Sequence, residues 1–433
     1  MSQAPSPYAR LMDTILTDPP VPLPSRLAVG ELARASVSAV SSAIASLSPG
    51  LGRPLPLDAD QVAAAYGSER HLRLDGAGIS GFAPLSGFWP TADGWVRTHG
   101  NYPHHATALC EALGLPASAA RDDVSDALRA REAAPAASAV REAGGVCVLV
   151  SREDPAADAA LRRHPLTEVS PLADSRPRRI PGAEESAPLA GVRVLDLTRV
   201  IAGPVATRTL AFAGADVLRL DPPQRPEIPW QHLDTGHGKR SALLDIAADR
   251  PRFDALLADA DVVVLGYRPD GLRRLGLEPR TLAAVHPQLI VAQLSAWHGA
   301  YSPRGFDSIV QADCGISWIE SSDGRTPGAL PAQALDHSAG YLLAAGIMTA
   351  LRRRGEAGGS WYVRTSLRRV AAELLGMRRT PTAAPMPAAA ARTQEFDVAG
   401  TRVTTVAPAV RWQGGPEMFR APRPWGGDAA EWW

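Results

Sequence analysis

The chain has 433 residues, of which 45% are hydrophobic, and this is enough to bury the cores of two or three domains. Lys plus Arg and Asp plus Glu number 45 each, so the net charge of zero provides no basic surface for nucleic acid or an anionic membrane. The three cysteines, Cys110, Cys147 and Cys314, include no CxxC pair, which argues against a disulfide framework or a zinc site. We therefore expect a globular protein of the reducing cytoplasm, with no metal and no nucleic-acid partner.

The N-terminal end of the chain is predicted to be an arm followed by a helix. Residues 1–25 are Pro-rich and are interpreted as the arm, while residues 26–47 have helical composition and apolar spacing. The first residues contain no apolar core of signal-peptide length, and the longest apolar run, residues 339–351, is too short to span a bilayer. We therefore expect no membrane partner.

Residues 26–155 are predicted to form a small α+β domain. Residues 89–96 have the pattern of two short strands around an Asp-Gly turn, and residues 145–151 that of another strand. Helical composition covers residues 103–114 and 119–143.

Two patterns in this region resemble ligand-binding motifs, but we interpret neither as a binding site. Residues 76–81 have the G-x-G-x-x-G spacing of a dinucleotide site, but the Pro and Gly residues that follow prevent the helix that such a site needs, so we predict a loop. His99, His104 and His105 have no carboxylate or cysteine at metal-ligand spacing, so we predict surface or loop histidines.

The second half of the chain alternates strands and helices. Residues 156–188 are rich in Pro, Arg and Glu and are predicted to be a linker, and residues 381–433 a C-terminal tail. Between them, residues 189–380 contain the apolar runs VRVLDLT, ADVLRLD, ADVVVLGY and QLIVAQLS, separated by helical segments at 203–213, 250–258 and 270–285. The expected fold class is α/β, with a Rossmann-like parallel sheet domain and a second, smaller α+β domain placed N-terminal to it.

The loop after the first of these strands, residues 199–204, is expected at the ligand crevice of such a sheet. Gly203 allows close approach of the backbone, and Pro204 suits the first turn of a helix. An ordinary strand-to-helix turn explains the same residues equally well.

Asp336 is the carboxylate that the sequence singles out, in PAQALDHSAGYLLAAGIMTAL. It stands where an apolar helix should begin, so it is either an ordinary N-cap or a nucleophile whose ionised form the helix N-terminus favours. Asp336, His337 and Ser338 cannot form a relay, because adjacent helical residues point about 100° apart. The residues alone leave both interpretations open.

Four motifs in order resemble the family III CoA-transferases, also called the CaiB/BaiF family. They are LAGVRVLDLTRVIAGPVATRTLAFAGADVLRLDPP, GKRSALLDI, ADVVVLGYRPDGLRRLGL and the Asp336 helix, and together they cover residues 189–375. Residues 87–150 resemble the family's small domain, which normally follows the first α/β part but comes first here. The family usually forms an interlocked homodimer, so the resemblance implies a homodimer and the altered order leaves the interlocking open.

The resemblance implies transfer of CoA between carboxylic acids, with acyl-CoA and a free acid as small-molecule substrates and no metal. Asp336 matches the nucleophile that forms a covalent aspartyl intermediate. The positions that match CoA-binding residues are Val200, Ile201, Ala202, Leu244, Gly266, Tyr267 and Arg274, with a structural role or ligand contact equally expected for Lys239 and Arg240 in the KRS motif.

Three departures from the family pattern leave alternatives open. Leu265 and Gly266 stand where the family usually has Glu-Asn, Arg364 replaces the Asp of a Val-Asp-Val-Ser strand, and the glycine-rich flap of some family transferases is missing. A 2-methylacyl-CoA racemase of the same family would need a proton-transferring His where this chain has Phe306, unless His337 takes that role. The third alternative is a non-catalytic CoA-binding subunit.

Overall fold

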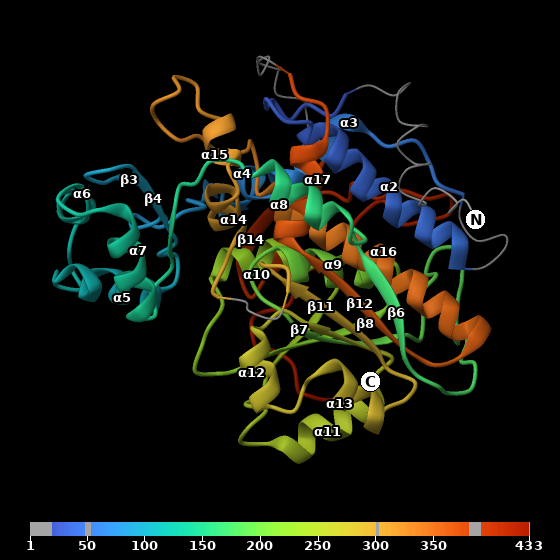
Figure 1. The fold of residues 1–433 in the computed structure, drawn as a ribbon. Helices are drawn as coiled ribbons and strands as arrows, with labels where there is room; N and C mark the ends of the chain where they lie inside the picture. Colours follow the sequence, from blue (N-terminus) through green and yellow to red (C-terminus); the bar gives the residue numbers. More distant parts are fainter. Residues whose placement is uncertain (1–19, 48–52, 300–302, 381–390, 433) are drawn as a thin grey trace.

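The computed structural model describes residues 20–47, 53–299, 303–380 and 391–432 (Figure 1). Its largest element is a seven-stranded sheet of order β6-β12-β11-β10-β7-β8-β9. Every neighbouring pair is parallel except β6 and β12, which run antiparallel at one edge. The strands are β6 (Glu168–Ala173), β7 (Arg193–Leu197), β8 (Asp216–Asp221), β9 (Arg240–Leu243), β10 (Val262–Leu265), β11 (Ile290–Ser295) and β12 (Ser360–Ser366).

The central strands are apolar because helices cover both faces of the sheet. All four residues of β10 are buried, with Val262 and Val264 in one core and Val263 and Leu265 in the other. One face is covered by α2 (Val29–Leu47), α9 (Ala202–Phe212) and α16 (Ala334–Ala357), and the other by α11 (Arg250–Ala258), α12 (Pro269–Arg274) and α13 (Pro279–Val285) (Figure 1). The predicted α/β fold class with a parallel sheet is confirmed.

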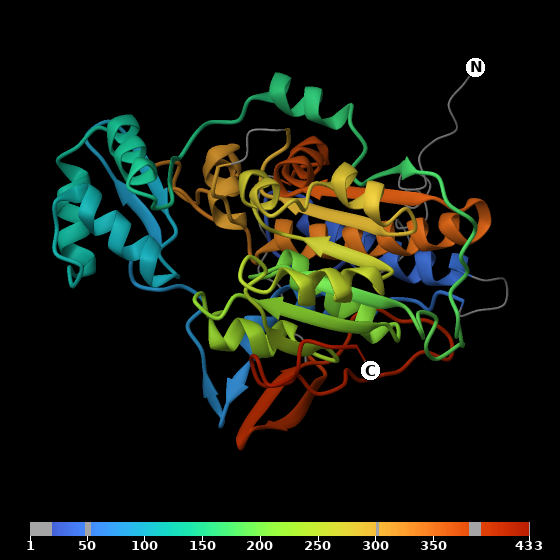
Figure 2. The same cartoon turned by 90° about the horizontal axis from the view of Figure 1, so that it is seen from below.

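The smaller unit has an antiparallel sheet of order β3-β4-β5 and its own core around Trp89, Leu109 and Leu128. It lies beside one end of the large sheet (Figure 2). The predicted Asp-Gly turn is present, because the Thr91 N–H donates to the Gly94 carbonyl at 2.9 Å. Its elements are β3 (Gly87–Pro90), β4 (Trp95–Thr98), α5 (Pro103–Leu113), α6 (Arg121–Arg129), α7 (Ala133–Glu142) and β5 (Cys147–Leu149).

The small domain was predicted to begin at residue 26, but helix α2 packs in the core of the large sheet. Its buried side chains, among them Leu32, Val40 and Ile44, lie in the same core as α16 and the sheet. The helix α3 (Ala59–Tyr66) joins the same core through Val62 and Tyr66. An amphipathic helix buries its apolar face against whichever surface completes it, and the sequence pattern does not name that surface.

The predicted linker and tail also contain regular structure. The linker region holds α8 (Pro155–Arg162) and the edge strand β6. Residues 76–78, predicted as a loop, lie in a short hairpin of β1 (Arg73–Leu74) and β2 (Ala77–Gly78). This hairpin joins the sheet β13-β14-β1-β2 with strands of the predicted tail, β13 (Thr393–Val398) and β14 (Thr401–Val406) (Figure 2). The loop prediction therefore holds for residues 76 and 79–81 and misses only the two-residue strand Ala77–Gly78, which pairs with β1.

The remaining helices are short and connect these layers. They are α4 (Ser68–His71), α10 (Pro229–Thr235), α14 (Asp307–Asp313), α15 (Ile316–Ile319) and α17 (Leu367–Gly376). Within the ranges that the structure describes, no helix is both long enough and apolar enough to cross a membrane.

Candidate active site

Asp336 lies in the first turn of α16 and is not its N-cap, which was one of the two interpretations that the sequence left open. The helix begins at Ala334 after Gln333, and Asp336 is the third helical residue. Its peptide N–H donates to Asp307 Oδ2 at 2.9 Å, so a carboxylate from α14 satisfies a free N–H of the first turn. The Asp336 side chain is therefore not needed as a cap.

Asp307 and Asp336 form a buried carboxyl pair. Asp336 is 6% exposed and Asp307 0%. Burial raises the pKa of Asp336 well above its usual range, and the nearby Asp307 carboxyl raises it further. Burial also raises the pKa of Asp307 to about 6, although hydrogen bonds from Gln311 and from the start of α16 oppose this. Burial thus favours the protonated form of both carboxyls, and each ionised carboxyl would favour the protonated form of the other.

The neighbours of Asp336 in the sequence point elsewhere. The His337 ring stacks on Tyr66 at a centroid distance of 5.1 Å, and the Ser338 and Tyr66 hydroxyls are 2.9 Å apart. Both contacts are with α3, whereas Asp336 lies beside α14. This agrees with the expectation that the three residues form no relay.

The small unit reaches the carboxyl pair. His99 stacks on Phe306, the residue before Asp307, with a centroid distance of 3.7 Å. Arg97 lies between the rings of Phe82 and Phe88, and its charge acts to lower the pKa of Asp307. His99 and Arg97, from the N-terminal third of the chain, thus lie beside the carboxyl pair.

The prediction of surface or loop histidines was wrong for His105, which is 5% exposed in helix α5, whereas His99 lies in the loop after β4 as predicted but is equally buried. Burial lowers the pKa of each imidazole to about 3, so both are neutral at neutral pH. No local pattern indicates this burial, because the ring that packs against both imidazoles is Phe306, far away in the chain.

The loop of Val200, Ile201 and Ala202 follows β7 and leads into α9. Gly340 of α16 packs on it so closely that an added Cβ would lie 2.6 Å from the Ala202 carbonyl oxygen. Because Asp336 and Gly340 are four residues apart, they share one face of α16. The structure thus places Asp336 on the helix face that lies against the start of α9.

Gly266 and Tyr267 follow β10 beside the same loop. The Gly266 N–H donates to the Leu197 carbonyl at 3.1 Å, and an added Cβ would lie 3.1 Å from the Thr198 Cβ. The Tyr267 hydroxyl is buried without a hydrogen-bond partner in the described residues. Burial, followed by the nearby Asp221 charge, raises the pKa of Tyr267.

Leu244 and Arg274 lie at two further points of this sheet edge. Leu244 follows β9 and donates its N–H to the Asp221 carbonyl at 2.9 Å. Arg274 is exposed on α12, and its Nε contacts the Asp270 carbonyl at 3.3 Å. Its guanidinium therefore remains accessible to a ligand.

Lys239 and Arg240 are engaged inside the protein. Lys239 Nζ is 3.1 Å from Asp196 Oδ2 and donates to the Pro204 carbonyl at 2.9 Å, and burial lowers its pKa to about 8. Arg240 Nη2 is 2.8 and 2.9 Å from the two carboxylate oxygens of Asp216. Of the two interpretations of the KRS motif, this geometry supports the structural one.

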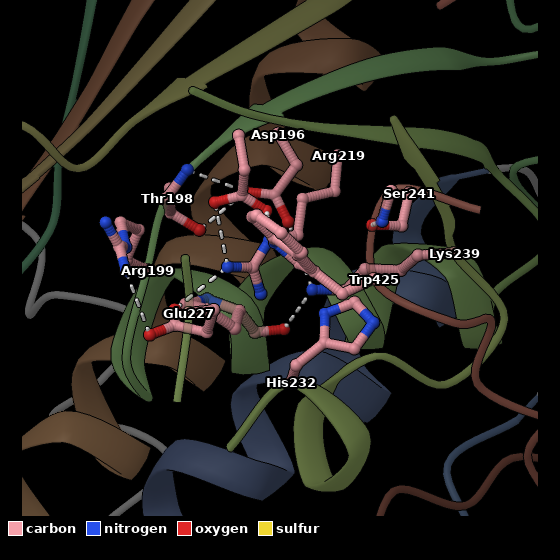
Figure 3. Close-up of polar contacts among 12 residues, drawn as sticks. Asp196, Thr198, Arg199, Arg219, Glu227, His232, Lys239, Ser241 and Trp425 are labelled. Atoms are coloured by element: carbon pink, nitrogen blue, oxygen red, sulfur yellow. Dashed lines mark hydrogen bonds and ion pairs between the residues drawn. The ribbon is translucent and has the colours of Figure 1, made fainter. Parts of the chain in front are cut away.

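A buried ionic network under the loop was not found from the sequence (Figure 3). Arg219 is 2.7 Å from Asp221 Oδ2 and 2.9 Å from Glu227 Oε2. Glu227 also accepts from the Val200 N–H at 3.1 Å and from the Tyr102 hydroxyl at 2.6 Å. Burial alone would raise the pKa of Glu227, but Arg219 and Arg199 hold it near 2. Glu227 stands in an irregular Pro-rich stretch, where no pattern marks it.

The sequence model of CoA-transferase family III matches residues 189–409, which is about half of the chain. The chain belongs to this family. The matched region contains strands β7 to β12 of the large sheet, helix α16 and both residues of the carboxyl pair.

Among curated family III relatives, the probable fatty acyl-CoA transferase Rv3272 of Mycobacterium tuberculosis is 32% identical over 45% of this chain and 54% of its own length. The succinyl-CoA–L-malate CoA-transferase alpha subunit of Chloroflexus aurantiacus is 31% identical over 42% of this chain and 48% of its own length. The chain thus spans about half the length of these relatives. The crystal structure of Rv3272 aligns over 46% of this chain and 57% of the other, with 31% identity and a TM-score of 0.41.

Proposed function

We propose that the protein transfers CoA between carboxylic acids through a covalent intermediate on Asp336. The observation that supports this most is the position of the Asp336 carboxyl in a family III chain, buried at the start of α16 against the loop after β7. A carboxylate so placed can attack a thioester carbonyl.

The reaction balances in four acyl exchanges. An Asp336 carboxylate oxygen attacks the acyl carbonyl, the C–S bond breaks, and a mixed anhydride and CoA thiolate form. The thiolate then attacks the aspartyl carbonyl and releases the first acid as its carboxylate. The acceptor carboxylate attacks the resulting aspartyl-CoA thioester, and the freed thiolate attacks the acceptor's acyl carbonyl, which restores Asp336.

We place CoA along the C-terminal edge of the sheet. Val200, Ile201 and Ala202 would line its channel, and Leu244, Gly266 and Tyr267 would flank the nucleotide end. The unpartnered Tyr267 hydroxyl supports this, because a buried polar group without a partner is costly unless a ligand completes it. Lys239 and Arg240 hold the edge in place by their internal ion pairs.

Arg274→Ala is expected to weaken CoA binding about tenfold, because one charge-assisted phosphate contact contributes roughly 1.5–3 kcal/mol. The matched control is Arg273→Ala on the same helix, where Asp270 and Glu278 already pair with the guanidinium. Calorimetric titration with CoA measures both. Equal affinities in the two variants would refute the placement of the phosphate at Arg274.

Asp307→Asn is expected to shift the acidic limb of the kcat/KM profile to lower pH. The attacking carboxylate must be ionised, and the Asp307 charge is one of the two causes that raise the pKa of Asp336. The control is Asp313→Asn at the other end of α14, which should leave the limb in place. A limb that stays in place for Asp307→Asn would show that Asp336 ionisation does not limit the reaction.

The racemase alternative is less well supported by the geometry. Phe306 cannot carry a proton, and His337 is turned toward Tyr66 on α3. The non-catalytic alternative predicts no covalent chemistry, so incubation with acyl-CoA separates it from the transferase. The transferase should form a hydroxylamine-sensitive adduct at Asp336, detected by mass spectrometry.

We also propose that the protein is a cytoplasmic homodimer. The support is the family membership, since family III chains usually pair. Light scattering coupled to size-exclusion chromatography tests the dimer, and a monomer mass at working concentration would contradict it.

A further inference from the structure

A second cavity of about 260 Å³ opens at the C-terminal ends of β11 and β12, apart from the residues assigned above. Its walls come from three parts of the chain. His164 and Glu168 flank the connection from α8 to β6, and His298 follows β11. Arg364 and Arg369 come from the end of β12 and the start of α17.

Arg364 is the free cation of this cavity. Its Nη2 donates to the Gly299 carbonyl at 3.1 Å, and no ion pair engages it in the described part of the chain. Arg369 is instead part of the wall, since it donates to the His164 carbonyl at 3.0 Å and pairs with Glu373 at 2.8 Å. The cavity thus presents one guanidinium that has no carboxylate within salt-bridge distance among the described residues.

Two imidazoles add donors beside Arg364. The His164 and His298 rings lie 4.7 Å apart between centroids. Burial lowers the pKa of His298, followed by the charges of Arg364, His164 and Arg369, while Glu168 acts in the opposite direction. The field around His298 is therefore net positive, which an anion would relieve.

The lining carries more cationic than anionic side chains, with Arg364 and Arg369 against Glu168. Among the described residues, no group of three or more His, Cys, Asp or Glu side chains is arranged to hold a metal ion. The N-terminus of α17, capped by Ser366, is at the same place and also favours negative charge. Glu168, the one carboxylate of the lining, is hydrogen-bonded by the Ser170 hydroxyl at 3.0 Å.

Arg364 is also the residue that reverses a charge relative to the family's Val-Asp-Val-Ser strand. The CoA placement proposed above does not use it. In the antiparallel β6–β12 pair, Arg364 lies opposite Glu168, and this register holds Arg364 at the cavity. Arg364 and Glu168 therefore both line the cavity, together with Arg369, His164 and His298.

We propose that this cavity is a binding site for a small oxyanion, a carboxylate- or phosphate-bearing metabolite held by Arg364 and the His164–His298 pair. A cavity of about 260 Å³ suits a molecule of a few carbon atoms and is too small for CoA. The guanidinium would bind one carboxylate or phosphate through two parallel hydrogen bonds.

Calorimetric titration of the full chain with succinate, and separately with inorganic phosphate, tests this proposal. The wild-type protein should bind at least one of the two anions, and the tighter one identifies the source of the oxyanion. Arg364→Gln should weaken that binding at least tenfold, and Arg364→Lys should restore part of it. The control Arg352→Gln removes a surface charge that is paired with Glu356 and should leave the affinity unchanged.

Asp336→Asn separates this cavity from the active site, because anion binding at Arg364 should persist in that variant. If Arg364→Gln does not fold, Arg364→Lys and the anion-induced rise in the wild-type melting temperature still decide the question. Failure of both anions to bind the wild-type protein, or equal affinities in Arg364→Gln and Arg352→Gln, would overturn the proposal. Anion binding that is lost in Asp336→Asn would also overturn it, since the anion would then be in the active site.

Discussion

Asp336→Asn is expected to abolish CoA transfer while leaving the melting temperature unchanged or slightly raised. Asparagine has the shape of aspartate but no charged oxygen to attack a thioester, so the covalent step is lost. The start of α16 keeps its cap, because Asp307 accepts the N–H of residue 336 whatever side chain that residue carries. Thioester exchange with labelled CoA, measured beside a thermal melt, tests both halves.

The same variant has a pH signature in stability. The folded pKa of Asp336 is raised above its unfolded value of about 3.8, so its contribution is fully present below that value and is lost as pH rises through the folded pKa. Asp336→Asn removes this titration. The wild-type protein should therefore lose more stability than the variant on going from pH 4 to pH 8, as measured by urea unfolding.

Asp254→Asn provides the matched control, because Asp254 is an exposed partner of Arg250 on the far face of the sheet. It should retain both activity and melting temperature. Wild-type exchange by the Asp336→Asn protein on a confirmed substrate would rule out the aspartyl mechanism. A wild-type protein that is inert toward a panel of donors and acids would instead favour the non-catalytic alternative.

The parts of the fold that could be predicted are those that depend on local sequence patterns. Buried parallel strands are nearly continuous apolar runs, so β7, β8, β10 and β11 were located from the sequence. The edge strand β6 was not, because its residues are only partly buried and its sequence includes Pro171. Strands β13 and β14 were missed as well, since the Pro-rich composition around them suggested a tail.

Of the candidate site, only the residue on helix α16 could be predicted from the sequence. Asp336 could be found because it is the first charged residue of an apolar helix and matches the family's nucleophile position, but its partner Asp307 could not. Their contact joins α14 to α16, and their pKa values rise chiefly through burial, with the Asp307 charge as a second cause for Asp336. The same holds for His99, whose burial lowers its pKa and whose ring is covered by Phe306, far along the chain.

Glu227→Gln is expected to destabilise the fold by about 3 kcal/mol or more at pH 7, as is usual when one partner of a buried ion pair is removed. Glu227 is 5% exposed and Arg219 1%, so the guanidinium would lose one of its two carboxylates where water cannot replace it. The folded pKa of Glu227 near 2 lies below its usual value of 4.5, so this stability is present above pH 4.5 and is lost as pH falls toward 2. Urea unfolding at several pH values measures both effects.

The control for this change is Glu278→Gln, in an exposed pair with Arg273 that should contribute less than about 1 kcal/mol. Glu227 also accepts a hydrogen bond from the Val200 N–H, so its loss should displace the loop after β7. The fraction of the variant that remains folded should therefore bind CoA more weakly. A purely structural role elsewhere in the sheet would lower stability without this loss of affinity. If Glu227→Gln unfolds at the same urea concentration as Glu278→Gln, the ionic network does not hold the loop, and the positioning of Val200 must come from the packing of Gly340 on Ala202 instead.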